Sequence, residues 1–123
     1  MIGVDIVQIA RIKKLLDRFG QRGLERFLNK SEIELAKRVE TIAGFWAAKE
    51  AIAKALGCGI GKKLSFKDIT IYKDNKGTPH FQLSSNAAKR FPIKEASLSI
   101  SHDGGFAIAV VAIELISSTS NKS

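Results

Sequence analysis

The chain has 123 residues, 45% of them hydrophobic and 26% charged, which suits one globular domain and is too short for two. Its net charge is +8, from 20 Lys and Arg against 12 Asp and Glu, and this favours acidic partners: nucleic acid, a phosphorylated cofactor or an acidic protein. No apolar run approaches the ~20 residues of a membrane span, and Asp5 stands where a signal peptide would carry lysines. The single cysteine, Cys58, excludes an internal disulfide and a cysteine zinc cluster, so we expect a cytoplasmic protein.

Residues 2–7, Ile-Gly-Val-Asp-Ile-Val, form a short apolar run with β-branched residues, which predicts a buried strand. Asp5 lies inside this run. An acid there is costly unless it is hydrogen-bonded, paired or bound to a metal. Two interpretations stay open: Asp5 caps the helix that follows, or it has a functional role.

A helix is predicted from Gln8 to Phe19, with apolar residues at helical spacing for the core. Its opposite side is basic, and the basic series continues beyond Gly20. Its main members are Arg11, Lys14, Arg18 and Arg22. A charge run is usually a solvated face, but a stripe of one sign on a basic chain also suits docking of an acidic partner.

Ser31 and Glu34 match a capping box and predict a second helical region. The helical pattern continues, with an expected break near residues 40–44, into a helix from Ala43 to Gly57. This helix is small or apolar almost all the way round, which is typical of a buried helix.

Only three charges interrupt the central helix: Lys49, Glu50 and Lys54. Glu50 and Lys54 are four residues apart and share a face, so the simplest interpretation is an ion pair on a solvent-facing edge. Three glycines, Gly57, Gly59 and Gly61, then introduce a loop with two lysines. Phosphate-binding glycine loops precede their helix, whereas this one follows, so we expect a flexible loop with exposed amides and draw only weak support for phosphate binding from it.

The second half of the chain predicts mainly strands. A strand at residues 65–73, a turn at 74–77 and a strand around Phe81 and Leu83 form a hairpin, followed by a short helix at 84–91. Strands are then predicted at 96–102 and 106–115, joined by Asp103-Gly104-Gly105.

The last strand is apolar on both faces, as in a strand at the centre of a sheet or packed against another subunit. His102 alternates with Leu98 and Ile100, so it is expected on the core side at the end of its strand, where a lone histidine more often has a structural role than a functional one. We interpret residues 1–116 as a single α+β domain, with a small antiparallel sheet against the central helix, and residues 117–123 as a disordered tail.

Two acids, Asp5 and Glu50, with Lys54 and the glycine–lysine loop, suit Mg²⁺, which takes one or two carboxylates and completes its octahedron with water and phosphate oxygens. This combination points to phosphoryl-type transfer on a nucleotide-like substrate. A zinc site would need more His or Cys, and no nucleophile elbow supports a serine hydrolase. A nucleic-acid-binding module would explain the charge but leaves the two acids unexplained.

Three motifs resemble the holo-acyl-carrier-protein synthase family, the short type of 4′-phosphopantetheinyl transferase. They are Ile2 to Val7, Trp46 to Ala51 with Lys54 to Gly57, and Ser99 to His102 with Ala107. The resemblance covers nearly the whole chain. It implies that family's α+β fold, a homotrimer with active sites between neighbouring subunits, and transfer of phosphopantetheine from coenzyme A to a serine of acyl carrier protein.

The resemblance also implies roles for single residues. Asp5 and Glu50 match the family's Mg²⁺-binding acids, and Lys54 matches a catalytic lysine that contacts coenzyme A phosphate. The glycines at 57, 59 and 61 and His102 match positions around the coenzyme A nucleotide. Arg11, Lys14, Arg18 and Arg22 fall on the helix that receives the acidic carrier protein.

Two departures from the family pattern stand out. Phe45-Trp46 replaces the usual Arg-Phe, so a basic contact is missing or supplied by Lys49 or Lys62, and Cys58 replaces a common threonine. The general base is not assigned: Glu32 or Glu34 acting through water, or a metal-bound water, are the alternatives.

Overall fold

The computed structural model describes residues 1–117, so the predicted disordered tail, apart from Ser117, lies outside the described residues. The elements in chain order are β1 (Ile2–Gln8), α1 (Ile9–Phe19), α2 (Gln21–Phe27), α3 (Lys30–Leu35), α4 (Val39–Ala55), the 3₁₀ turn η1 (Phe66–Asp68), β2 (Ile69–Lys73), β3 (Pro79–Leu83), α5 (Ser85–Arg90), β4 (Ile93–Asp103) and β5 (Phe106–Leu115). Helices combine with two small antiparallel sheets, so the predicted α+β class is confirmed.

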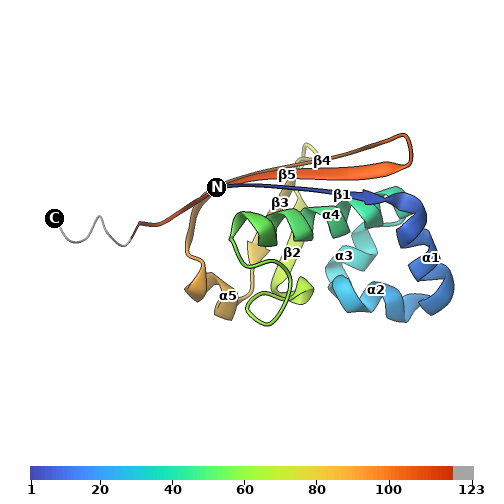
Figure 1. Ribbon diagram of the computed structural model, residues 1–123, viewed down its shortest axis with the longest axis horizontal. Coiled ribbons are helices and arrows are strands. Elements are labelled where there is room, and N and C mark those ends of the chain that lie inside the picture. The colour runs from blue at the N-terminus through green and yellow to red at the C-terminus, as the bar shows by residue number, and fades with distance from the viewer. Residues whose placement is uncertain (118–123) are drawn as a thin grey trace.

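The larger sheet has the strand order β1-β5-β4, and the smaller one pairs β2 with β3. β5 is therefore the central strand, and its Ala109 pairs with Asp5 on one side and with Ile100 on the other. In Figure 1 the three-stranded sheet runs along the top, α4 lies beneath it, and α1 to α3 gather at one end.

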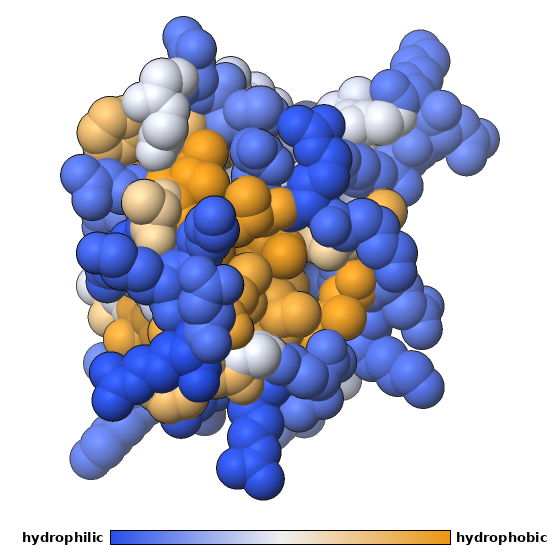
Figure 2. Space-filling view, turned by 90° about the vertical axis from the view of Figure 1, so that its right-hand side faces the viewer, coloured by the Kyte–Doolittle hydropathy of each residue, from blue (hydrophilic) through white to orange (hydrophobic). Residues whose placement is uncertain are grey.

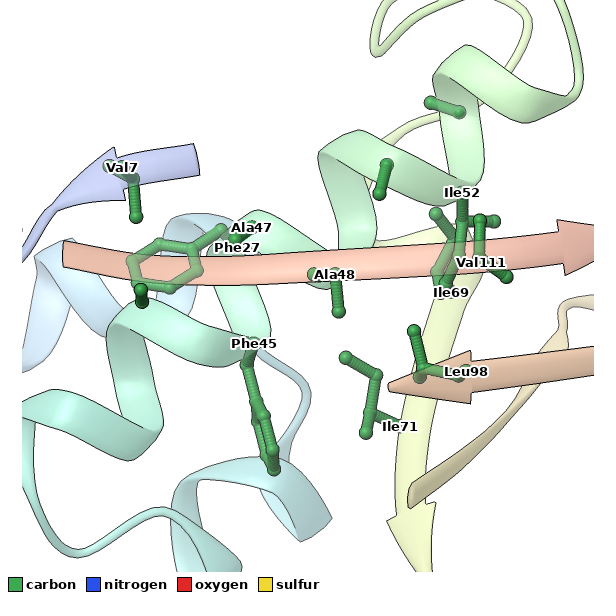
Figure 3. Close-up of a cluster of buried hydrophobic side chains, with 14 of the residues drawn as sticks. Val7, Phe27, Phe45, Ala47, Ala48, Ile52, Ile69, Ile71, Leu98 and Val111 are labelled. Carbon is green, nitrogen blue, oxygen red and sulfur yellow. The ribbon is translucent and has the colours of Figure 1, made fainter. Parts of the chain in front are cut away.

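The core lies between α4 and this sheet (Figure 3), and small side chains on α4 let the two approach closely. A Cβ on Gly3 of β1 would overlap the carbonyl oxygen of Ala51. Towards the start of the helix, a Cβ on Gly44 would lie 2.7 Å from Ile100 Cγ2 of β4. The helix thus crosses the sheet from β4 to β1, and glycine is needed at both contacts because no side chain fits there.

Over β1 and β5, the outer face of the sheet is apolar and exposed. Along β1 and β5, side chains alternate between the core and solvent, and Ala107, Ala109 and Val111 are buried. The solvent-facing set, called here the apolar sheet face, is Ile2 (76% exposed), Val4 (51%), Ile6 (59%), Phe106 (40%), Ile108 (38%) and Val110 (42%). Contiguous exposed apolar surface of this kind marks an interaction site. None of the described helices has the length and apolar character of a membrane span.

Two predicted boundaries in the first half are wrong. The capping box before α3 joins Asn29 to Glu32 and not Ser31 to Glu34, and the break before the central helix falls at residues 36–38 and not at 40–44. Long-range contacts explain the first difference, because the Asn29 amide donates to Thr70 Oγ1 at 2.9 Å and so ties the start of α3 to β2. The predicted strand at residues 65–73 is likewise shorter, because residues 66–68 form η1.

Candidate functional site

Asp5 occupies the inner side of β1, between the buried Gly3 and Val7, and faces α4. Its Oδ1 atom lies 2.7 Å from Lys54 Nζ, and the Asp5 side chain is 15% exposed. Lys54 also donates to the carbonyl of Val4 at 3.3 Å. Asp5 therefore does not serve as the cap of the following helix, whose N-cap position is held by Gln8.

Glu50 lies half-buried on α4, close enough to Asp5 for the two carboxylates to repel each other. Burial, and next the charge of Asp5, raise the pKa of Glu50, while Lys54 and Arg11 act in the opposite direction. An ion pair of Glu50 with Lys54 was the simplest interpretation of the helix taken alone, but the ammonium of Lys54 is bonded to Asp5. The structure thus brings Asp5, Glu50 and Lys54 together.

The carboxylates of Asp5 and Glu50 suit a divalent cation. Among residues 1–117 there is no cluster of three or more His, Cys, Asp or Glu side chains that could hold a metal by themselves. Mg²⁺ does not require such a cluster, because it commonly takes one or two carboxylates and completes its shell with water and substrate phosphate. The mutual repulsion of the two acids is the feature that a bound cation would relieve.

The glycine loop follows Lys54 directly, at the same end of α4. The expectation that it presents free amides is wrong for its glycines: the amide of Gly57 donates to Lys54 O, that of Gly59 to Ala53 O, and that of Gly61 to Leu64 O, at 2.9–3.1 Å. Gly57 and Gly59 have φ of 80° and 64°, which closes the helix end. A Cβ on any of the three would meet nothing within 4 Å, so a ligand has open space beside them.

His102 lies apart from the two acids. It lies on the α4 side of β4 with Leu98 and Ile100, as expected, but it is exposed because it stands at the end of the strand. It lines a hollow of about 180 Å³ together with Glu40, Thr41, Phe45, Lys73, Gly77, Pro79 and Ile100. β5 separates its strand from the strand of Asp5, and the hollow that His102 lines includes neither Asp5 nor Glu50.

The predicted basic residues form an exposed series on α1 and α2, named the basic stripe: Arg11, Lys14, Arg18 and Arg22. Figure 2 views the end of the molecule where α1 and α2 lie, and hydrophilic side chains there surround a central apolar area. Arginines of this region make cation–π contacts with two aromatic rings. The guanidinium of Arg11 lies 5.9 Å from the ring centre of Trp46, and those of Arg18 and Arg26 lie 5.1 and 4.4 Å from that of Phe19.

The buried ion pair of Lys49 and Glu32 was not expected. Both side chains are 0% exposed and their charged atoms are 2.7 Å apart. Lys49 also donates to the carbonyls of Phe27 and Phe66, and Glu32 Oε2 accepts the amide of Ile71. Lys49 therefore cannot replace a missing surface arginine, and Glu32 cannot be the general base, because neither reaches a substrate.

A family model described as the 4′-phosphopantetheinyl transferase superfamily matches residues 1–111. The chain is 62% identical over 113 residues to a holo-[acyl-carrier-protein] synthase of Sulfurovum sp. (strain NBC37-1), covering 92% of this chain and 95% of that protein. It is 55% identical over 122 residues to one of Sulfurimonas denitrificans, covering 99% of each.

Solved structures agree with these sequence matches. The crystal structure of Helicobacter pylori holo-[acyl-carrier-protein] synthase in complex with coenzyme A aligns with a TM-score of 0.89 at 55% identity, covering 93% of this chain and 100% of that one. The Neisseria meningitidis synthase aligns with a TM-score of 0.85 at 38% identity, covering 92% and 96%.

Proposed function

This chain belongs to the 4′-phosphopantetheinyl transferase superfamily, and from that premise we propose how its residues perform the transfer. The protein moves the 4′-phosphopantetheine group from coenzyme A to a serine of apo acyl carrier protein, a step of fatty acid biosynthesis. Adenosine 3′,5′-bisphosphate is the other product. We take residues 1–116 as one transferase domain working in the cytoplasm. The observation that carries the proposal is the cluster of Asp5, Glu50 and Lys54 at the contact of β1 with α4.

Asp5 and Glu50 are proposed to hold Mg²⁺. Support comes from the nearness of the two carboxylates: Asp5 is paired with Lys54, and its charge, after burial, helps to raise the pKa of Glu50. When bound, the ion would neutralise pyrophosphate charge and make the β-phosphorus more electrophilic.

Lys54 is proposed to contact the phosphate at the reaction centre. Its side chain is 54% exposed, so its ammonium can turn from Asp5 to a phosphate oxygen. The Asp5 carboxylate, which is only 15% exposed, would then need the proposed Mg²⁺ to balance its charge. The carrier serine oxygen forms a bond to the β-phosphorus, and the bond from this phosphorus to the bridging oxygen breaks. The bridging oxygen leaves with adenosine 3′,5′-bisphosphate, and Lys54 stabilises the charge that develops on the phosphates.

The serine proton requires an acceptor. Because Glu32 is fully buried, the acceptor is Glu34 acting through water or a metal-bound water. Glu34 is exposed on α3 and lines a hollow with Gln21, Glu25 and Lys67.

We propose a homotrimer in which neighbouring subunits complete each active site. The apolar sheet face supplies surface for self-association, and the separation of His102 from the carboxylates within one chain is explained if His102 serves its neighbour's site. His102 and the glycine loop at Gly57, Gly59 and Gly61 would then contact the coenzyme A nucleotide from two subunits.

The basic stripe is proposed to bind the acidic carrier protein. Arg11, Lys14, Arg18 and Arg22 are exposed and of one sign, which steers an acidic partner and predicts weaker binding as salt rises.

The test is to incubate the protein with apo carrier protein, coenzyme A and Mg²⁺ and to weigh the carrier by mass spectrometry. We expect the carrier to gain the mass of phosphopantetheine, and EDTA to abolish the gain. A carrier that stays apo, while a known transferase modifies it in the same buffer, would contradict the proposal. Modification that continues in EDTA would contradict the metal role alone.

A further inference from the structure

Arg11 stands where the basic stripe meets the carboxylate pair. Its side chain is exposed on the first turns of α1, yet its positive charge acts on the Glu50 carboxylate. Its guanidinium lies over the indole of Trp46, 5.9 Å from the ring centre, and Trp46 is the one tryptophan of the chain. A cation over an indole face is attracted by the ring's quadrupole, and tryptophan is the strongest of the aromatic partners.

The indole is itself held by two further rings. Phe27 meets Trp46 edge-on with ring centres 5.0 Å apart, and Phe66 lies tilted against it at 4.8 Å. The carbonyls of these same two phenylalanines accept hydrogen bonds from the buried Lys49 ammonium, at 2.7 and 3.0 Å. Lys49 is three residues from Trp46 on α4, so the end of α2, η1 and α4 are tied together around the indole.

We propose that Trp46 is a positioning residue for carrier binding: its ring fixes the guanidinium of Arg11 at the edge of the active site, ready for an acidic group of the carrier. This inference rests on the proposed function. A free arginine has several rotatable bonds, and ordering it at an interface costs conformational entropy. The fixed ring removes part of this cost before the carrier arrives. Trp46 thus acts through Arg11.

Two other roles for Trp46 would not depend on Arg11. The indole could serve only as a core aromatic, or it could touch the carrier directly as an apolar contact. In either case, replacing Trp46 would have the same effect whether or not Arg11 is present.

The experiment is a double-mutant cycle with Trp46→Leu, Arg11→Ala and the double variant, measuring KM for carrier and KM for coenzyme A. Trp46→Leu should raise KM for carrier about threefold and leave that for coenzyme A unchanged. In the Arg11→Ala background, the same change should have no further effect. Multiplying effects in the double variant would overturn the proposal.

Phe19→Leu is the matched control, because the Phe19 ring also makes cation–π contacts, with Arg18 and Arg26 but not with Arg11. Its effect on KM for carrier should multiply with that of Arg11→Ala. If Phe19→Leu also has no effect on KM for carrier in the Arg11→Ala protein, that protein does not respond to any such change and the inference fails.

A second measurement does not need a Trp46 variant to fold. Arg11→Ala changes an exposed side chain and should increase acrylamide quenching of the Trp46 fluorescence, since the guanidinium covers the ring. Unchanged quenching would overturn the contact. A wild-type protein that leaves the carrier apo would refute the proposed function, whereas an active protein with independent Trp46 and Arg11 would refute this inference alone.

Discussion

Glu50 is a residue that the fold tolerates at a cost. Burial and the charge of Asp5 raise its pKa, so the folded protein holds a proton on Glu50 more readily than the unfolded chain does. The ionised carboxylate therefore lowers the stability of the fold, and this loss grows as pH rises from the unfolded pKa through the folded pKa. Functional sites commonly carry such local strain because the chemistry requires it.

Glu50→Gln should lower turnover by about 100-fold or more, because a proposed metal ligand and transition-state charge are lost. The same change should raise the melting temperature at pH 7 in the absence of divalent ions. The gain should disappear near pH 3, which lies well below the unfolded pKa of about 4.3. Calorimetry at the two pH values, with the carrier-mass assay, checks both parts.

Glu25→Gln, at an exposed position on α2, is the control and should leave turnover and melting unchanged. Near-native turnover in Glu50→Gln would remove Glu50 from the proposed site. A lower melting temperature at pH 7 would mean that its carboxylate stabilises the fold.

Single residues of the candidate site could be predicted where the local pattern is unusual. An acid in a strand of apolar residues and another in a helix of small ones pointed to Asp5 and Glu50, and the structure places them together. The partners of the lysines could not be predicted. Lys54 bonds Asp5 across 49 positions and Lys49 bonds Glu32 across 17, and helical spacing says nothing about such distant contacts.

At the scale of elements, the Lys49–Glu32 pair links α4 to α3, with further bonds to the end of α2, the start of η1 and the middle of β2. Removing one charge leaves the other buried and unpaired. Lys49→Met alone should therefore lower the free energy of unfolding by about 3 kcal/mol. Urea unfolding measures this loss, provided that the m-value is the same in the variant and the wild type.

The double variant Lys49→Met with Glu32→Gln is the informative partner of that measurement. It keeps an acceptor for the Ile71 amide and removes both charges, so it should recover much of the lost stability. If the double variant loses as much as the sum of both single changes, the charge imbalance is not the cause of the instability.

Asp68 ties η1 to the turn before α5, and this link should depend on pH. Its carboxylate accepts the Ser65 amide at 2.9 Å and the Ser84 hydroxyl at 2.7 Å, and these bonds lower the pKa of Asp68, with that from Ser65 the largest cause. The stability it contributes is fully present above the unfolded pKa of about 4 and is lost as pH falls through the lower folded pKa. Asp68→Asn should thus unfold more easily at pH 7, and the difference from wild type should shrink at pH 3.

Urea midpoints of the two proteins at both pH values decide this prediction. Asp17→Asn, at an exposed acid of α1, should stay within about 0.5 kcal/mol of wild type throughout. An Asp68→Asn deficit that is equal at pH 3 and pH 7 would show that the bonds do not depend on the charge.

The type of most helices and strands could be predicted from the sequence, whereas the residues at which they begin and end could not. The β2–β3 hairpin, the β4–β5 pair and the buried central helix follow from alternation, turn residues and helical spacing. The starts of α3 and α4 could not be predicted. Asn29 is held at the start of α3 by its hydrogen bond to Thr70. Gly44 lies inside α4, where a break was expected, because it packs closely against Ile100.

At the scale of the whole molecule, two features of the chain support the proposed association of subunits. The apolar sheet face is exposed over β1 and β5, and the hollow lined by His102 lies away from Asp5 and Glu50. Both facts have one explanation if subunits associate through the sheet and share active sites. From the sequence, the two apolar faces of β5 indicated either a central strand or a strand at a subunit interface, because both have the same pattern.

Shared active sites predict complementation between two inactive chains. Glu50→Gln lacks an acid and His102→Ala lacks the histidine, so each homotrimer has only defective sites. In mixed trimers, a site that takes Glu50 from one chain and His102 from its neighbour is intact, and random assembly at equal amounts makes about a quarter of the sites intact. We therefore expect coexpressed chains, purified by size-exclusion chromatography and verified as trimers by light scattering, to regain about a quarter of wild-type turnover. If each site draws both residues from one subunit, coexpression restores nothing and the sharing of active sites is refuted. A His102→Ala protein with wild-type turnover would instead show that His102 is not part of the site.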